Sequence, residues 1–549
     1  MNHHPELRLA HQNRELPCSV IKRRGVKVQF FKPVQTINKK VNMDSTNSIF
    51  KQALLTGCAI LVCGLLSNAL ATDYYISSRG NDAQDGRSIQ TAWASIGKVN
   101  ASGFVPGDSI LFEGGKTFTG CLTIINQPGN ATSRITIDSF GSGRAVVSAG
   151  NGTGIRVSGS SYLTLRNIDV IGSGRKSGNT QSGISISSSH FFVMDSIAAS
   201  GFQRSGVEVG NCNGGTLTHA YVHDNGYAGI SVSGGQNMYI GYCVAENNPG
   251  DPAILNNHSG NGIIVGAGLR KCLIEYCEAM NNGWDMPRGG NGPAGIWGYQ
   301  VDSLTIQYCI AHDNKTSPNG GDGDGFDLDG GARNCVIQYC YAYNNLGPGY
   351  LLCQYEGASA WTNNTIRYCI SQNDGTKNGQ AGILFWGRGL TSAYLYNNVV
   401  YNQLNYAFEL HDPCPGCKLW NNIFVTKGPT IFGNSSGYDF RANCYWKIGG
   451  GFLCEGYTNF TAWASAKNQE LTNGTIAGIN QDPLLKNAGM NTLTDPAKLK
   501  TFVDYQLQPN SPCLNRGLDL KRWFAIDPGP HGFYGNRIPV DGNCDLGVQ

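Results

Sequence analysis

A short phrase recurs along the middle of the chain, in which a small residue precedes an apolar residue, a variable residue and, in most copies, a second apolar residue. This alternation has the two-residue period of a β-strand with one buried face. Successive copies start 23 to 33 residues apart, and a repeat of that length predicts a solenoid in which each copy belongs to one coil. The copies are Gly154–Val157, Gly183–Ile186, Gly206–Val209, Gly229–Val232, Gly262–Val265, Gly295–Gly298, Gly325–Leu328, Gly349–Leu352, Gly382–Phe385 and Ala407–Leu410.

A second strand pattern follows the first in each repeat and ends in a Tyr-Cys pair, as in Leu273–Cys277 and Leu304–Cys309. Asparagines follow at matching distances, so each coil should hold two or three strands, with equivalent residues about 4.8 Å apart in successive coils. Stacked asparagine side chains can hydrogen-bond to one another and satisfy buried polar groups. We therefore predict an internal ladder from Asn247-Asn248, Asn281-Asn282, Asn314, Asn344-Asn345 and Asn373.

The 19 cysteines fall into different classes by position. Those of the Tyr-Cys pairs recur on one strand face, which predicts a column of packed interior thiols rather than cross-links. Cys414 and Cys417 instead form a CxxC in a turn, a candidate for a local disulfide in an exported chain. The column consists of Cys243, Cys277, Cys309, Cys340 and Cys369.

The composition agrees with a chain of short strands joined by tight turns. Glycine is abundant, with 74 residues, and only 14% of the residues are charged. The net charge of +3 and the lack of a long basic run after the leader give no support for binding nucleic acid. We expect a monomer.

A leader segment is predicted near the N-terminus. Lys51 precedes an apolar stretch, residues 53–66, and then Ala69-Leu70-Ala71, the pattern of a secretory signal peptide. The alternative, a membrane anchor, needs about 20 apolar residues, more than this stretch has. We expect a signal peptide over residues 43–71, a secreted protein in the periplasm or outside the cell, and no membrane association after cleavage. Residues 1–42 are then an upstream extension or the result of a misassigned start.

Two kinds of segment flank the repeat, including Asp73–Ser77 on the N-terminal side and Phe533–Asn536 on the C-terminal side. These segments resemble those of bacterial right-handed parallel β-helix polysaccharide lyases and their relatives. The resemblance covers nearly all of the chain after the leader, and it implies an all-β right-handed parallel β-helix of about ten or more coils. We expect a cap and first coils over residues 72–135, the helix proper over 136–430, and further coils with an irregular closing region over 431–549. The residues that carry the resemblance are Asp73–Ser77, Gly80–Asp82, Trp93–Ile96 and Gly107–Phe112 at the N-terminal side, with Leu507–Cys513 and Phe533–Asn536 at the C-terminal side.

Two columns of residues should point outward from the first strand of each coil. Aromatic residues accompany carboxylates in the middle coils of these columns, and exposed aromatic faces suit the binding of sugar rings. We predict that a polysaccharide lies here, with Trp297, Tyr299, Trp386 and Glu409 as binding residues. The alternative is that the long turns over residues 252–261, 284–294 and 313–324 cover the aromatics. The two columns are Trp297, Asp327, Leu351, Leu384 and Glu409, and Tyr299, Asp329, Cys353, Trp386 and His411.

The densest acidic motif is Gly321–Gly331, with four aspartates within eight residues. Such carboxylates repel one another unless a cation or a shared proton relieves them. Its Asp-Gly-Phe-Asp core is similar to the calcium-binding motif of family 9 pectate lyases, and the resemblance implies that Asp324 and Asp327 bind Ca²⁺. Gly323 stands where that family has another aspartate, for which Asp322 could substitute. The following coils carry no lysine where that family's base is expected.

Three functions remain open for this motif. In a lyase, Arg388 or His411 would remove a proton from a uronic acid while Ca²⁺ neutralises its carboxylate. In a glycoside hydrolase, Asp327 and Asp329 would act as an acid/base pair about 7 Å apart on one strand face. In a non-catalytic solenoid, the same surface would only bind glycans. We place the lyase first. His258 could reach the groove from its turn, but we interpret it as a solvated residue.

Overall fold

The computed structural model describes residues 71–377, 379–539 and 544–549, and these described residues form one compact unit. Residues 1–42 and residues 43–70 of the predicted leader lie outside the described residues. Within the described part, no helix has the length and apolar character needed to cross a membrane.

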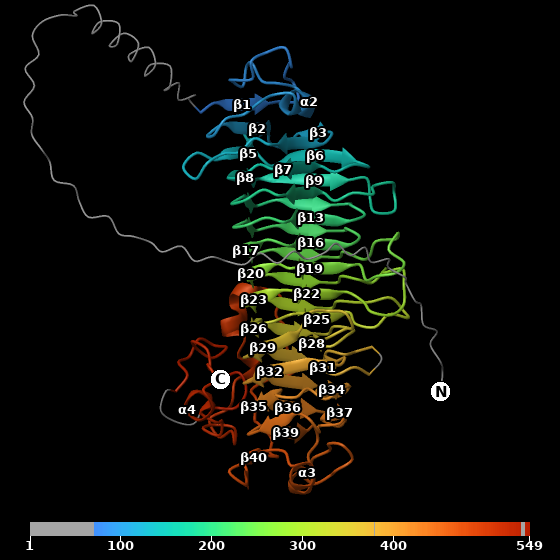
Figure 1. Ribbon diagram of the computed structural model, residues 1–549, viewed down its shortest axis with the longest axis vertical. Helices are drawn as coiled ribbons and strands as arrows, with labels where there is room; N and C mark the ends of the chain where they lie inside the picture. The colour runs from blue at the N-terminus through green and yellow to red at the C-terminus, as the bar shows by residue number, and fades with distance from the viewer. Residues whose placement is uncertain (1–70, 378, 540–543) are drawn as a thin grey trace, which may run out of the picture. The chain divides into compact units, whose positions relative to one another are not determined.

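Three long parallel sheets run the length of a right-handed β-helix, as Figure 1 shows from β1 in blue to β39 in orange. We name these sheets A, B and C and give their strands below. A typical coil contributes one strand to each sheet, in the order C, A, B along the chain. Sheet A has 14 strands: β1 (Asp73–Ile76), β2 (Ser109–Glu113), β5 (Ile135–Phe140), β8 (Leu163–Arg166), β11 (Val193–Asp195), β14 (Thr216–Thr218), β17 (Gln236–Gly241), β20 (Arg270–Glu275), β23 (Asp302–Gln307), β26 (Val336–Gln338), β29 (Trp361–Arg367), β32 (Leu390–Tyr396), β35 (Lys418–Trp420) and β38 (Asp439–Arg441).

Sheets B and C complete the coil. Sheet B has 13 strands: β3 (Thr117–Thr119), β6 (Ala145–Gly150), β9 (Ile168–Gly172), β12 (Ala198–Ser200), β15 (Tyr221–His223), β18 (Val244–Glu246), β21 (Glu278–Met280), β24 (Ile310–His312), β27 (Tyr341–Tyr343), β30 (Ile370–Gln372), β33 (Val399–Asn402), β36 (Ile423–Thr426) and β39 (Cys444–Lys447). Sheet C has 12 strands, which contain the repeated phrases of the sequence: β4 (Leu122–Ile125), β7 (Ile155–Ser158), β10 (Ile184–Ser187), β13 (Ser205–Gly210), β16 (Ala228–Ser233), β19 (Asn261–Gly266), β22 (Ala294–Tyr299), β25 (Asp324–Leu328), β28 (Tyr350–Cys353), β31 (Ile383–Trp386), β34 (Phe408–Leu410) and β37 (Ile431–Gly433).

The remaining elements lie at the two ends of the chain that the structure describes. They are α2 (Ile96–Asn100) near the N-terminal coils, and α3 (Phe460–Lys467), β40 (Leu471–Thr472), β41 (Thr475–Ile476), η1 (Pro496–Thr501), η2 (Val503–Tyr505) and α4 (Leu520–Phe524) after the last coil. The strands of the three sheets therefore extend from Asp73 to Lys447, on both sides of the predicted central segment 136–430.

Apolar residues of sheet C fill the interior, as the alternating pattern predicts. Ile296, Phe326, Tyr350, Ile383 and Phe408 are all fully or almost fully buried. The rings of Phe326 and Tyr350 stack at 5.3 Å between centroids, and the Tyr350 hydroxyl donates to backbone carbonyls of neighbouring strands. The buried tyrosine is therefore compatible with the apolar core because its polar atom is paired.

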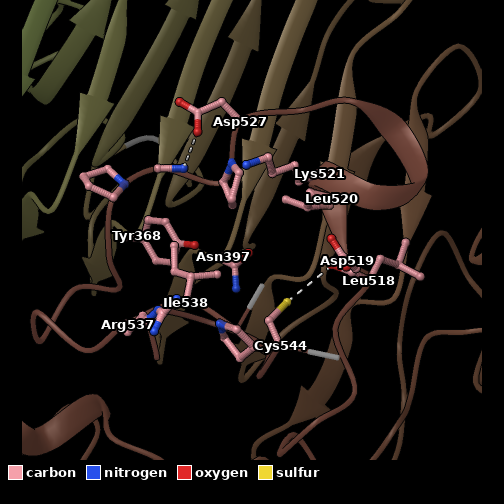
Figure 2. A pocket seen from close by; sticks show the side chains of 14 residues that line it. Tyr368, Asn397, Leu518, Asp519, Leu520, Lys521, Asp527, Arg537, Ile538 and Cys544 are labelled. Carbon is pink, nitrogen blue, oxygen red and sulfur yellow. Dashed lines mark hydrogen bonds between the residues drawn. The ribbon is translucent and has the colours of Figure 1, made fainter. Parts of the chain in front are cut away.

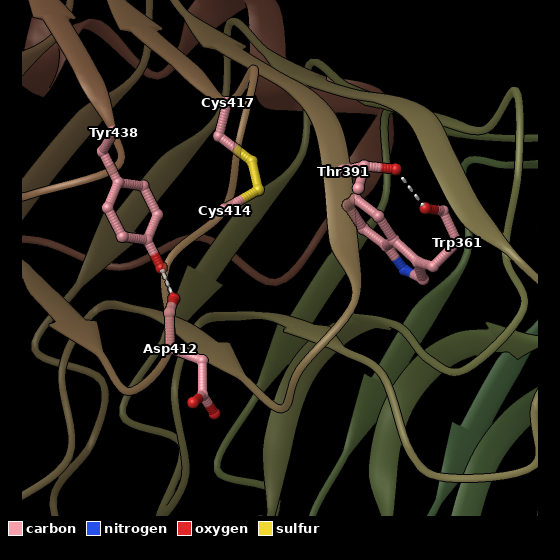
Figure 3. Close-up of a disulfide and its surroundings, with 6 residues drawn as sticks. All are labelled: Trp361, Thr391, Asp412, Cys414, Cys417 and Tyr438. Carbon is pink, nitrogen blue, oxygen red and sulfur yellow. Dashed lines mark hydrogen bonds between the residues drawn. A yellow bond between two sulfur atoms is a disulfide. The ribbon is translucent and has the colours of Figure 1, made fainter.

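The predicted thiol column is confirmed: Cys243, Cys277, Cys309, Cys340 and Cys369 are buried and free. Cys414 and Cys417 form the disulfide expected of their CxxC turn (Figure 3). The turn lies beside Tyr438, whose hydroxyl donates to the carbonyl of Asp412.

The C-terminal segment packs back along the outside of the coils. His531 lies against Tyr339 at 4.5 Å between ring centroids and hydrogen-bonds to the hydroxyl of Tyr308 at 2.9 Å. A cavity of about 190 Å³ lies between this segment and the strand ends, beside Tyr368, Asn397 and Cys544 (Figure 2). None of the site residues predicted from sequence lines it.

An asparagine ladder runs through five coils and ends on a carboxyl group in the sixth. Each amide Nδ2 donates to the Oδ1 of the next member at 2.8–3.1 Å, and its second proton goes to a backbone carbonyl. The predicted ladder is confirmed for Asn248, Asn282, Asn314 and Asn345, whereas Asp374 takes the last place instead of Asn373. Its first member is Asn225.

A second ladder of the same kind follows in the later coils. Asn398 donates to Asn422 and Asn422 to Asn443, each at 3.0 Å, and Asn443 donates to Glu470 at 2.7 Å. Burial raises the pKa of both terminal acids, Asp374 and Glu470, to about 7. Both ladders thus end on an acceptor that burial keeps largely protonated in mildly acidic solution.

The first prediction concerns the interior of the ladder. Replacing Asn282 with alanine removes the acceptor of two Asn248 donors, its backbone N–H and one proton of its side-chain amide. It also removes one donor each to Asn314 Oδ1 and the Ala245 carbonyl, although the backbone N–H of residue 282 still donates to Asn314 Oδ1. Because an unpaired buried group costs about 1–3 kcal/mol, the two Asn248 donors alone should lower the free energy of unfolding by at least about 2 kcal/mol in urea denaturation. Asn256→Ala, an exposed control, should change it by less than about 0.5 kcal/mol. Equal effects of the two variants would contradict the ladder's role.

The second prediction concerns the acids that end the ladders. Between the ordinary carboxyl pKa of about 4 and the folded pKa of about 7, the folded chain holds protons that the unfolded chain has lost. These two groups therefore lower the free energy of unfolding as pH rises through that window, and their effect levels off above it. Urea denaturation from pH 4 to 8 should show a shallower decline in Asp374→Asn and Glu470→Gln than in the wild type. Parallel curves would show that the two acids do not titrate as described.

Candidate active site

A cavity of about 920 Å³ lies on the outer side of sheet C, over strands β22, β25, β28, β31 and β34. It brings together most of the site residues predicted from sequence. Those that line it are Trp297, Tyr299, Asp322, Asp327, Asp329, Trp386, Glu409 and His411, whereas Asp324 and Arg388 do not.

The strand register aligns the two predicted outward columns. Trp297 pairs with Asp327, Asp327 with Leu351, and Leu384 with both Leu351 and Glu409 in successive coils. Three coil steps therefore separate Asp327 from Glu409, about 14 Å at the strand spacing. These two carboxyl groups are too far apart to act on the same bond.

Long turns cover part of this outward face. Trp297 is only 3% exposed and Asp327 only 5%, although both point away from the core. Trp386 also lines the cavity and is 47% exposed. The prediction of exposed aromatics is therefore wrong for Trp297, which the preceding turns cover, and confirmed for Trp386.

The turns that cover the site are fastened to one another. Gly290 and Gly320 form a parallel bridge between two successive turns, and the amide of Gly321 donates to the Gly290 carbonyl at 2.6 Å. Lys377, from a later turn, donates its amine to the Gly320 carbonyl at 2.7 Å. These contacts fix the position of the turn that carries Asp322.

Three aspartates line the same cavity. The amide of Gly292 donates to Asp322 at 2.6 Å, and Asp329 receives the amide of Gly330 at 2.6 Å and a hydrogen bond from the Cys353 thiol. Asp327 Oδ1 has no hydrogen-bond partner in the described chain. Asp329 is thus the carboxylate best supplied with donors, and Asp327 the worst.

Burial raises the pKa of all three acids, and repulsion from neighbouring carboxylates adds to the shifts of Asp322 and Asp327. Burial raises the pKa of Asp322 to about 6, while the Gly292 amide opposes that shift. Burial followed by the charges of its neighbours holds the pKa of Asp327 well above its ordinary value. Burial also raises the pKa of Asp329, opposed by the donors from Cys353 and Gly330. The cluster therefore contains both a group that keeps a proton near neutral pH and groups that release theirs more readily.

Asp324 lies beneath this cluster and takes no part in the cavity surface. It is fully buried, its Oδ1 has no partner among the described residues, and burial holds its pKa well above the ordinary value. In the described part of the chain, no three Asp, Glu, His or Cys side chains are placed to share a metal ion. Asp322, Asp324 and Asp327 therefore do not form the ligand set that the resemblance implies, and bound Ca²⁺ stays a prediction.

Aromatic rings and one histidine form the end of the cavity nearest β16 and β19. His258 packs edge-on to Trp297 with 4.9 Å between ring centroids, and Tyr227 and Tyr299 flank the pair. The interpretation of His258 as a solvated turn residue is wrong, because the turn folds inward and leaves it 9% exposed. Burial lowers the pKa of His258 to about 4, so the ring is neutral near pH 7.

The opposite end of the cavity carries an ion pair. His411 Nε2 lies 2.7 Å from Glu409 Oε1, and this hydrogen bond raises the pKa of His411. Arg388, the other predicted base, is 93% exposed at its side chain and lies 3.4 Å from Asp412, outside the cavity lining. The structure therefore brings His411 to the site and leaves Arg388 at the surface.

Sequence reasoning did not assign to the site the residues that enter the cavity from turns. Tyr227 and His258 precede their strands β16 and β19 by one and three residues, where the strand alternation no longer applies. Cys353 stands in the predicted outward column, but no pattern distinguishes a thiol that bonds Asp329 from one that merely packs. The signal that could have found Tyr227 and His258 is their short distance from the strand phrase of the same coil.

The third prediction tests the calcium ion. Because the acidic residues do not converge as ligands, millimolar Ca²⁺ or a chelator should leave the melting temperature unchanged in a thermal unfolding assay. A ligand that binds only the folded chain would raise it. A rise with Ca²⁺ that is lost in Asp324→Asn would restore the predicted site.

The chain matches a family model described as "Right handed beta helix region" over residues 153–285 and 253–461. It is 26% identical to a lacto-N-biosidase of Bifidobacterium longum subsp. longum across 87% of this chain, and it spans only 36% of the length of that protein.

Among solved structures, the GH136 lacto-N-biosidase of Eubacterium ramulus is 17% identical, with a TM-score of 0.46 over 65% of this chain and 67% of that one. The pectate lyase Pel9A is 15% identical, with a TM-score of 0.43 over 87% and 96%. The family model spans more than half of the chain, which therefore belongs to the right-handed β-helix family.

Proposed function

We propose that the protein is a glycoside hydrolase that acts on an uncharged glycan held in the cavity of sheet C. The observation that carries this proposal is the charge of the cavity. Four carboxyl groups line it, and none of the described lining residues is lysine or arginine. The four are Asp322, Asp327, Asp329 and Glu409.

This charge disfavours the lyase that the sequence analysis placed first. β-Elimination acts on a uronic acid, whose carboxylate must be neutralised as the proton next to it leaves. A polyuronate entering this cavity would meet further negative charge instead. His411, the base candidate that reaches the site, tends to keep its proton because Glu409 raises its pKa. An uncharged sugar chain meets no such repulsion.

Asp327 and Asp329 fit the two roles of hydrolysis. Asp327, poorly supplied with donors, keeps its proton and can donate it to the glycosidic oxygen as general acid. Asp329, held by the Gly330 amide and the Cys353 thiol, is stabilised as the carboxylate that activates water. Residues i and i+2 of a strand are about 7 Å apart, within the roughly 6.5–9.5 Å of inverting enzymes. Asp322 adds negative charge that helps Asp327 retain its proton.

The sequence relative supports a glycan as the substrate. A lacto-N-biosidase is named for cleaving a sugar, and the similarity extends over most of this chain. Because the chain spans about a third of that protein, its activity enters here only as part of the proposal. Export from the cell and a monomeric state belong to the proposal as well.

The fourth prediction separates hydrolysis, elimination and binding. With neutral oligosaccharides, new reducing ends should appear without the absorbance near 235 nm that an unsaturated uronate gives. Pectate and alginate should give neither signal, with or without Ca²⁺. Absorbance at 235 nm would instead establish a lyase, and retention on a glycan column without cleavage would establish a binding protein.

The fifth prediction tests the roles of the acids. Asp327→Asn and Asp329→Asn should each lower kcat by about 10² to 10⁴, the usual contribution of a general acid or base. The alkaline limb of the pH–rate profile should reflect deprotonation of Asp327, and the acid limb protonation of Asp329. Asp302→Asn, on the outer face of sheet A, is the control and should retain activity. If Asp322→Asn and Asp329→Asn abolish activity while Asp327→Asn does not, Asp322 rather than Asp327 is the acid.

A further inference from the structure

We propose that His258 is a specificity-determining residue of the cavity, whose Nε2–H donates a hydrogen bond to an uncharged acceptor oxygen of the bound glycan. The inference rests on the proposed function for the nature of the ligand. The protonation of the ring follows from the structure alone and can be tested without any activity.

The orientation of the Asn261 side chain fixes the tautomer of His258. The indole Nε1–H of Trp297 can only donate, and it lies 3.1 Å from Asn261 Oδ1. The carbonyl of Tyr227 can only accept, and it lies 3.0 Å from Asn261 Nδ2. Two independent partners thus assign the oxygen and the nitrogen of this amide, which a hydrogen-bond network otherwise leaves ambiguous.

The second proton of the Asn261 amide then points to His258. Asn261 Nδ2 lies 3.3 Å from His258 Nδ1, and since the amide nitrogen must donate, Nδ1 must accept. A neutral imidazole that accepts at Nδ1 carries its proton at Nε2. No described residue hydrogen-bonds to Nε2, so this N–H remains available on the side of the ring opposite Asn261 in a residue that lines the cavity.

The surroundings keep this donor uncharged. The ring is buried against Trp297 and near Tyr227, and both its burial and the positive charge of Arg288 lower its pKa, to about 4. At neutral pH the group therefore offers a hydrogen bond without a positive charge. It can recognise a hydroxyl or amide oxygen, but it cannot compensate the charge of a carboxylate beside three aspartates.

The His258 donor lies close to the place where the glycosidic bond would be cleaved. Trp297 is the register partner of Asp327, one coil step or about 4.8 Å away, and His258 packs on the edge of Trp297. The donor thus faces the sugar that lies next to the scissile bond on the aromatic side. The indole N–H of Trp297 is already bonded to Asn261, so of these two packed rings it is His258 whose N–H remains for the ligand.

The tautomer and charge of the His258 ring are tested by nitrogen NMR of the full-length protein labelled with ¹⁵N-histidine. The resonances that disappear in His258→Gln should report a neutral Nε2–H tautomer at pH 7, and they should titrate only below about pH 5. Asn261→Asp replaces the donor to Nδ1 with an acceptor and should move the proton to Nδ1. An Nδ1–H tautomer or a charged ring in the wild type at pH 7 would overturn the proposal even if the protein hydrolyses glycans.

Recognition of the glycan is tested with a neutral oligosaccharide in two ways. KM and kcat are measured by kinetics in the protein with an intact Asp327, and Kd is measured by calorimetry in the Asp327→Asn background. His258→Phe keeps an aromatic ring against Trp297 but has no donor, and it should raise KM and Kd about five- to tenfold with kcat changed by less than about twofold. His258→Gln supplies an amide donor and should recover most of the affinity. His219→Ala, at an exposed histidine outside the cavity, should have no effect.

The outcomes separate this inference from the proposed function. If a glycan binds without being cleaved and His258→Phe weakens that binding, the donor role of His258 is supported and the proposed hydrolase activity is rejected. If cleavage occurs and His258→Phe changes neither KM nor Kd, hydrolysis stands and the donor role is wrong. Equal losses in His258→Phe and His258→Gln, with both variants folded by circular dichroism, would also overturn it, because then the ring rather than the N–H is required.

Discussion

Each coil lies on the next at the strand spacing of about 4.8 Å, and this stacking decides which side chains a position can carry. A side chain in the solenoid always has an equivalent above and below it, so its chemistry must suit both neighbours. Amides satisfy this condition because each can donate to the next and accept from the previous one. The ladders that end on Asp374 and Glu470 show that such a row must finish on a group that only needs to accept.

The same constraint explains how the cavity acquires acids with raised pKa. Asp327 stacks between Trp297 and Leu351, neither of which offers a hydrogen-bond donor to its carboxyl group. A charge placed between two apolar neighbours loses hydration without gaining a partner, and its pKa therefore rises. The coil geometry that builds the core thus also produces a proton-holding acid on the outer face, provided that turns exclude water from it.

The sequence predicts the solenoid and its interior because both depend on local periodicity. The inward residues of sheet C, the thiol column and most of the first ladder follow from a two-residue alternation repeated at coil length. The outward columns are also correct in register, which is why Asp327, Asp329 and Glu409 could be named in advance. The periodicity of the sequence does not predict the path of the turns. Trp297 and His258 are buried because turns with no repeat of their own fold over them, and Arg388 belongs to a turn that leaves it exposed outside the cavity lining.

The turns also determine which chemistry the acidic motif can support. A cluster of four aspartates in the sequence suggests a cation, since ligand sets and proton-sharing sets contain the same residue types. The folded chain distinguishes them by direction. Asp324 is buried outside the cavity lining, and Asp322 accepts a hydrogen bond from the Gly292 amide of the covering turn. Asp327 and Asp329 face the cavity. With the acids divided in this way and no lysine or arginine among the described lining residues, protons held by the buried carboxyl groups relieve part of their repulsion. Such a site is suited to proton transfer, and its aromatic end with a neutral histidine supports our proposal that the ligand is an uncharged sugar.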